Sequence, residues 1–173
     1  NMEDSLDAVT PRIFEQDNPF DRALRLEVVT GKERLQEALR FSISAPADSE
    51  KVQLNYQMLP LLMQRRFMAQ HVRDCFSLAR TLQPMIEEGN ADGSLCVKHP
   101  QQAAEMMMLL LNFYVIYESE GMNGEEMHER LLCVKATLDS IGLTILDEEM
   151  LLICVKMYGS YYASQQAATE EAP

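Results

Sequence analysis

The sequence contains no tryptophan, and its 173 residues include only 15 lysines and arginines against 27 aspartates and glutamates. The resulting net charge of −12 opposes binding to phosphate backbones and to anionic membrane surfaces. No apolar run reaches the roughly 18 residues of a membrane span, and no basic segment leads into an apolar stretch at the amino end. We therefore expect no membrane partner and no contact with nucleic acid by this chain alone.

Cysteine pairs at the spacing of a zinc ribbon or a redox site are also missing. The four cysteines, Cys75, Cys96, Cys133 and Cys154, are far apart in the sequence, which favours a reduced, cytoplasmic protein. Glycine-rich phosphate loops and glycine-flanked nucleophile turns are absent as well. We therefore predict that the chain is not an enzyme and holds no cofactor.

What remains is a composition that is 47% apolar, with the spacing of apolar residues that is typical of helices. The alternation that marks strands is missing. We predict an all-α fold, a helical bundle of about seven to eight helices. Residues 1–164 are expected to form a single regulatory domain, and residues 165–173 a flexible tail.

Several helix starts are marked by capping residues followed by proline or by a capping-box glutamate. They are Thr10 with Pro11, Asn18 with Pro19, and Thr30 with Glu33. The helix that opens at Thr30 is predicted to end before Pro46. Another helix is predicted from Asp48 or Ser49 to a break near Pro60.

The segment from about Gln64 to Gly93 predicts one long helix. Apolar residues recur along it at alternating spacings of four and three, whereas charged residues lie off this stripe. Pro84 inside the helix predicts a kink, and Gly93 is suited to a left-handed C-cap. We therefore expect a long amphipathic helix with one buried face.

Two later helices lack a polar face. The helix predicted over 100–119 contains an apolar run interrupted only by Asn112, and the helix predicted over 147–163 is apolar on all sides near its start. The helix between them, over 123–142, has a single apolar stripe. Because a small monomer rarely buries two helices on every side, we expect a homodimer with a four-helix interface.

Two motifs flank the end of the long helix. Residues 85–95 read MIEEGNADGSL, in which a glycine, three residues and a second glycine precede Leu95, and residues 99–104 read HPQQAA. Together, within 82–114, they resemble the carboxy-terminal domain of TetR-family transcriptional regulators. In that family the first motif ends a long helix and the second opens a dimerisation helix.

The resemblance implies a regulatory domain that binds a small, mainly apolar or aromatic effector and forms a homodimer. The family's amino-terminal helix-turn-helix unit has no counterpart in this sequence, so we expect the regulatory half of a longer repressor. DNA is then a partner only through that missing domain. The alternatives are a stand-alone helical homodimeric interaction module without a ligand and, third, a helical enzyme or metal protein.

The chain has twelve methionines, whose flexible side chains suit irregular apolar sites. Facing stripes of the long helix and the next helix predict an effector cavity, with His71 and Tyr114 as its polar groups. The predicted ligand-binding residues are Phe67, His71, Cys75, Met107, Leu111 and Tyr114.

A metal site is the competing interpretation of the same segment. His71 and Cys75 lie one turn apart, and His128 and Cys133 are candidate ligands from another helix. Cys75 falls on the apolar stripe, however, where a free cysteine is typically a small hydrophobic residue. We therefore predict no metal.

Overall fold

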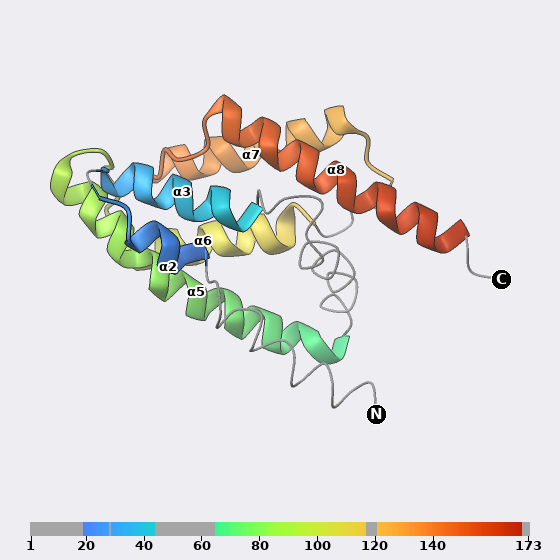
Figure 1. Cartoon of the computed structure of the whole chain (residues 1–173), viewed down its shortest axis with the longest axis horizontal. Coiled ribbons are helices and arrows are strands. Elements are labelled where there is room, and N and C mark those ends of the chain that lie inside the picture. The colour runs from blue at the N-terminus through green and yellow to red at the C-terminus, as the bar shows by residue number, and fades with distance from the viewer. Residues whose placement is uncertain (1–18, 28, 44–64, 117–120, 171–173) are drawn as a thin grey trace.

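The computed structural model describes residues 19–27, 29–43, 65–116 and 121–170 (Figure 1). Within them, side chains are described for residues 21–27, 29–40, 68–116 and 121–159. The elements are α2 (Pro19–Leu24), α3 (Gly31–Ile43), α5 (Arg65–Asp92), α6 (Pro100–Leu109), the π-helical turn η1 (Leu110–Tyr114), α7 (Gly124–Ser140) and α8 (Glu148–Glu170).

The described residues contain helices and no strand, which confirms the all-α prediction. They include six α-helices, fewer than the seven to eight predicted. The helices predicted near Thr10 and from Asp48 to Pro60 fall outside the described residues. None of the described helices has the length and apolar character needed to cross a membrane.

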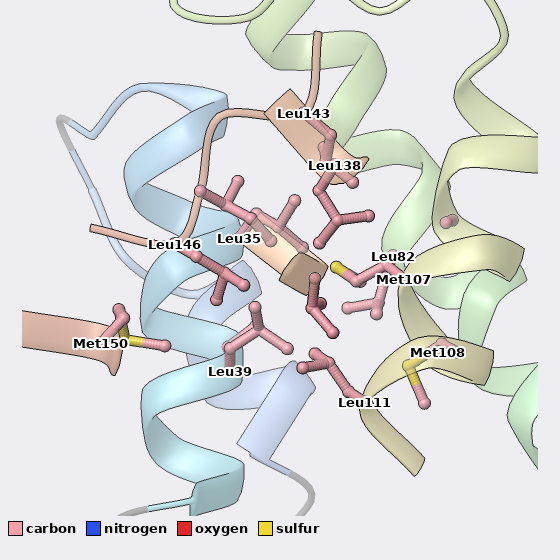
Figure 2. Packing of buried hydrophobic residues seen from close by; sticks show 14 of the residues in the cluster. Leu35, Leu39, Leu82, Met107, Met108, Leu111, Leu138, Leu143, Leu146 and Met150 are labelled. Atoms are coloured by element: carbon pink, nitrogen blue, oxygen red, sulfur yellow. The ribbon is translucent and has the colours of Figure 1, made fainter. Parts of the chain in front are cut away.

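Helix α3 lies between α5 and α8 (Figure 1). Helix α5 packs against both α3 and α6, α7 packs against α8, and α2 packs against α3. Their apolar faces meet in one core, where Figure 2 shows side chains from all of the longer helices pointing toward one another. The fully buried members include Leu35, Leu82, Met107, Leu138 and Met150. Removing these apolar surfaces from water is the main stabilising contribution.

Several of the predicted helix ends are confirmed. The backbone N–H of Thr30 donates to the carboxylate of Glu33 at 2.7 Å, and the N–H of Glu33 donates to the Thr30 hydroxyl at 3.2 Å, so the two residues form a reciprocal capping box. Pro19 and Pro100 are the first residues of α2 and α6, as predicted. Gly93 follows α5 with a φ of +82°, the left-handed conformation expected of a C-cap.

The helix predicted over 100–119 is not a uniform α-helix. It changes at Leu110 into the π-turn, where the N–H of Val115 donates to the carbonyl of Leu110 at 3.0 Å, five residues back instead of four. The side-chain amide of Asn112 donates to the carbonyl of Met108 at 2.9 Å, a local hydrogen bond of the kind that competes with the helical ladder. Apolar spacing alone does not encode this change.

The last helix also differs from its predicted length. Helix α8 begins after Asp147, whose carboxylate accepts a hydrogen bond from the N–H of Met150 at 2.8 Å. It runs to Glu170 and not to Ala163, so it includes most of the segment assigned to a tail. Its final turns extend beyond the other described helices (Figure 1).

The first of the two resemblance motifs has a packing role at the crossing of α3 and α5. A Cβ atom added to Gly31 would lie 2.5 Å from the carbonyl oxygen of Met85 and 2.6 Å from the Cα of Gly89. A Cβ on Gly89 would in turn meet the side chain of Leu95 at 2.7 Å. Two glycines therefore let the two helix backbones touch, and Leu95 closes over them.

The side chain of Asn90 holds the connection from α5 to α6 by pairing with the backbone of Val97 as a neighbouring strand would. The amide of Asn90 donates to the carbonyl of Val97 and accepts from its N–H, both at 2.8 Å. Gly142, at a φ of +85°, packs against the carbonyl of Cys96 in the same connection. The loops before α6 and before α8 are thereby fixed to each other.

One side chain fastens α2 to the body of the protein. The guanidinium of Arg34 donates to the carbonyls of Ala23 at 2.8 Å, Leu24 at 3.2 Å and Leu26 at 2.8 Å. It also donates to both carboxylate oxygens of Glu88 on α5, at 2.8 and 3.2 Å. Arg34 therefore satisfies the carboxy-terminal end of α2 and ties it to α3 and α5.

Candidate ligand site

The candidate site lies where the amino-terminal half of α5 meets the π-turn. His71 and Cys75 are four residues apart on α5, so their side chains share one face of the helix. Cys75 is buried in the core, whereas His71 is half-buried at its edge. The sequence therefore predicts correctly that these two residues lie next to each other.

The ring of Phe113 packs against His71. The ring centroids are 4.9 Å apart and the planes are tilted by 46°, a geometry typical of favourable ring contacts. Phe113 belongs to the π-turn and is half-buried. This contact joins α5 to η1 at the site and supplies an aromatic wall for it.

The π-turn is also tied to α8. In a regular α-helix the N–H of Val115 would bond the carbonyl of Leu111, but here it bonds Leu110. The carbonyl of Leu111 accepts a buried 2.8 Å hydrogen bond from the hydroxyl of Tyr158. Three elements, α5, η1 and α8, therefore meet around the turn.

The other predicted site residues are distributed differently. Leu111 is buried at the turn, while Met107 is fully buried in the core, close to Leu82 in Figure 2. Tyr114 is 43% exposed, and its ring lies under the guanidinium of Arg130 at 5.2 Å. The backbone carbonyl of Tyr114 also accepts from Arg130 at 3.0 Å. The side chain of Phe67 lies outside the described side chains.

Two residues of the site are missing from the sequence prediction, Phe113 and Tyr158. The predicted stripe extends from Met107 and Leu111 with α-helical spacing, but a π-turn rotates the residues that follow it about the helix axis. The five-residue turn delays the helical repeat by one residue, so the stripe continues at the fully buried Val115, while Tyr114 is 43% exposed. The aromatic ring beside His71 is that of Phe113. A signal for Tyr158 exists in the sequence, because it follows an apolar run, and a tyrosine that such a run carries into the core needs a partner for its hydroxyl.

The electrostatics of the site favour uncharged side chains. Burial lowers the pKa of His71 below its ordinary value of 6.5, although the nearby carboxylate of Asp74 acts in the opposite direction. Burial also raises the pKa of the Cys75 thiol to about 11. Both groups are therefore neutral at pH 7, and Cys75 is a poor nucleophile.

A single polar atom of the site is left without a partner. Nε2 of His71 is buried and makes no hydrogen bond within the described part of the chain. Buried polar atoms are nearly always paired, so this nitrogen is available to a group brought by a ligand or by water. The arrangement suits hydrogen bonding to a neutral molecule.

No group of three or more His, Cys, Asp or Glu side chains among the described residues is arranged to hold a metal ion. Of the residues in the competing metal interpretation, His128 is half-buried on α7 and Cys133 is exposed there.

Comparison of the chain with protein-family models, with curated proteins and with solved structures gives no match.

Proposed function

We propose that the chain is a regulatory domain of the kind found in TetR-like transcriptional repressors, which binds a small, mainly apolar effector and forms a homodimer. In this proposal the effector is sensed without being transformed. DNA is contacted only by a separate helix-turn-helix domain, in keeping with the net charge of −12.

The motifs that carry the resemblance support the proposal through their structural roles. Gly89 allows the close crossing of α5 with α3, Gly93 ends α5 in a left-handed conformation, and Leu95 packs on Gly89. Pro100 then opens α6. The motif residues therefore specify how the long helix ends and how the next begins, which is the feature that the resemblance concerns.

The observation that carries the effector-binding part is the unpaired Nε2 of His71 beside the π-turn. It combines a buried polar atom with the apolar and aromatic side chains of Cys75, Leu111 and Phe113. Sites for small molecules typically have mostly apolar walls and a few polar groups that fix the orientation of the ligand. π-Turns within α-helices also occur frequently at functional sites.

A thermal-shift screen of lipophilic and aromatic compounds tests effector binding. An effector at about 100 times its dissociation constant should add about 2.7 kcal/mol of apparent stability. Leu111→Trp enlarges a buried side chain at the π-turn and should abolish the shift. Ala136→Trp, at an exposed position on α7, is the matched control and should retain it. A compound that stabilises Leu111→Trp as much as wild type would place its site elsewhere.

The dimerisation part is supported by apolar side chains left exposed on the two helices predicted to form the interface. Met106 of α6 is 44% exposed and Leu152 of α8 is 66% exposed. Gly159 lies on the same face of α8 as Leu152, two turns later, with open space around it. An exposed leucine near an uncovered glycine suits close packing against a helix of a second copy.

The same exposed leucine favours the second candidate, a stand-alone helical module that dimerises without an effector. The two functions differ in one measurable property. The stand-alone module would be favoured if the protein is a dimer that no compound in the screen stabilises, and if Leu111→Trp leaves its dimerisation unchanged.

A further inference from the structure

The half-buried imidazole of His71 is the starting point for an inference about the class of effector. Its Nε2 atom is buried and has no hydrogen-bond partner in the described part of the chain. The Phe113 ring packs against the imidazole, with the ring centroids 4.9 Å apart and the planes tilted by 46°. A partner for Nε2 must approach in the plane of the imidazole ring, because the lone pair or the N–H of this nitrogen lies in that plane.

The neighbouring π-turn is an independent observation that points to the same place. It lies within the long apolar run and is held in its irregular form by the hydrogen bond from Tyr158 to the carbonyl of Leu111. Irregular helical turns of this kind persist when surrounding contacts support them and are frequent at functional sites. The turn therefore places an aromatic ring beside the unpaired nitrogen.

The surrounding charges decide which effectors suit this nitrogen. The π-turn, LLNFY, contains no charged residue. Arg73 on α5 donates to Gln70, and Arg130 on α7 is engaged with Tyr114. The carboxylate of Asp74, whose charge acts on His71, accepts from Gln70. Among the described side chains no cation bonds to Nε2 of His71, and Asp74 would repel a carboxylate ligand that had left water.

We infer that the effector is an uncharged, mainly apolar molecule with one hydroxyl group, an alcohol or a phenol, whose hydroxyl hydrogen-bonds to Nε2 of His71. A hydroxyl both donates and accepts, so it satisfies either neutral tautomer of the imidazole. This inference rests on the proposed function, because it names the ligand class of the same site.

Three probes that share a butylphenyl group test the inference: 4-butylphenol, butylbenzene and 4-butylbenzoate. Their dissociation constants are measured by calorimetry for wild type, His71→Phe and the control His128→Phe. Wild type and His128→Phe should bind the phenol about tenfold more tightly than butylbenzene. In His71→Phe the two constants should become equal, while 4-butylbenzoate should bind most weakly to wild type.

The ¹⁵N resonance of Nε2 provides a second measurement that needs no variant. Saturating wild type with 4-butylphenol should shift this resonance, and butylbenzene should leave it unchanged. This measurement keeps the inference testable if His71→Phe does not fold.

Failure of the inference is distinguishable from failure of the proposed function. Equal binding of phenol and butylbenzene to wild type, with both blocked by Leu111→Trp, would overturn the hydroxyl assignment and leave effector binding intact. Tighter binding of 4-butylbenzoate, or an Nε2 resonance that 4-butylphenol does not shift, would also overturn it. The lack of saturable binding by all three probes would overturn both.

Discussion

The hydroxyl of Tyr158 in α8 donates a buried 2.8 Å hydrogen bond to the backbone carbonyl of Leu111, at the turn where helical bonding changes from four residues to five. The relationship is reciprocal. The turn leaves the Leu111 carbonyl accessible to a side chain, and the tyrosine satisfies it. An irregular backbone is thus stabilised by a residue 47 positions away in the sequence.

Removing this hydroxyl tests the relationship. Tyr158→Phe keeps the ring but leaves the Leu111 carbonyl without this donor in a buried place, so it should lower the free energy of unfolding by about 1–2 kcal/mol. Urea unfolding followed by circular dichroism measures the effect. Tyr114→Phe, at an exposed ring, is the control and should change stability little. Equal losses in the two variants would contradict the assigned role of Tyr158.

The crossing of α3 and α5 predicts that Gly31 does not tolerate a side chain. Gly31→Ala brings its Cβ against the backbone of Met85 and Gly89, which cannot move as a side chain can, so the loss should be at least about 2 kcal/mol. Gly124→Ala is a matched control, since Gly124 also opens a helix but has open space around it. It should be neutral or stabilise by up to about 1 kcal/mol. Similar melting temperatures for the two variants would refute the close crossing.

Thiol reactivity should divide the four cysteines into two pairs. Cys96 and Cys133 are exposed, whereas burial raises the pKa of Cys75 to about 11 and that of Cys154 to about 12. Since the thiolate is the reactive form, Ellman's reagent should modify Cys96 and Cys133 rapidly in the native protein. The other two should react only on unfolding. Rapid modification of Cys75, located by mass spectrometry, would contradict its burial.

Acidification should destabilise the protein through His71. Because burial lowers the pKa of this imidazole in the folded state below 6.5, the unfolded chain binds the proton more readily. The stabilisation is fully present above about pH 6.5 and is lost as the pH falls through the lowered pKa. Free energies of unfolding measured across this range should decline more steeply for wild type than for His71→Phe. Parallel curves would argue against a neutral, buried imidazole.

The proposed dimer predicts a specific sensitivity to charge on α8. Leu152→Glu places a carboxylate at a position that is 66% exposed in a single chain, so it should shift light-scattering mass from dimer to monomer. Ile141→Glu is the control, because Ile141 is also exposed and apolar but lies at the end of α7. The single chain should fold in both cases. A monomeric wild type, or dissociation by Ile141→Glu alone, would exclude this interface.

Local signals predict most of the helix ends, because each depends on a few neighbouring residues. The capping box is a pair of hydrogen bonds between Thr30 and Glu33, which are three residues apart. Pro100 and Gly93 act through their own backbone conformations. The long helix and the juxtaposition of His71 with Cys75 follow from the helical repeat in the same way.

The features of the fold and of the candidate site that the sequence does not predict depend on contacts between distant segments. The π-turn needs Tyr158, and the approach of Gly31 to Gly89 needs two helices in register. Once the turn delays the helical repeat by one residue, the stripe of Met107 and Leu111 continues at the buried Val115 and not at Tyr114. The α-helical spacing therefore places Tyr114 on this stripe, whereas the structure leaves it 43% exposed, and the ring that contacts His71 is that of Phe113.

Arg34 attaches the end of α2 to α5 close to the point where α3 crosses α5. Glu88, which holds this attachment, is next to Gly89, where the backbones of α5 and α3 touch. We consider a tilt of α5 about this crossing. His71 lies about 25 Å away along the same helix, so each degree of tilt displaces it by about 0.4 Å. Such a tilt would move the His71 end of α5 far more than the end at which α2 is attached.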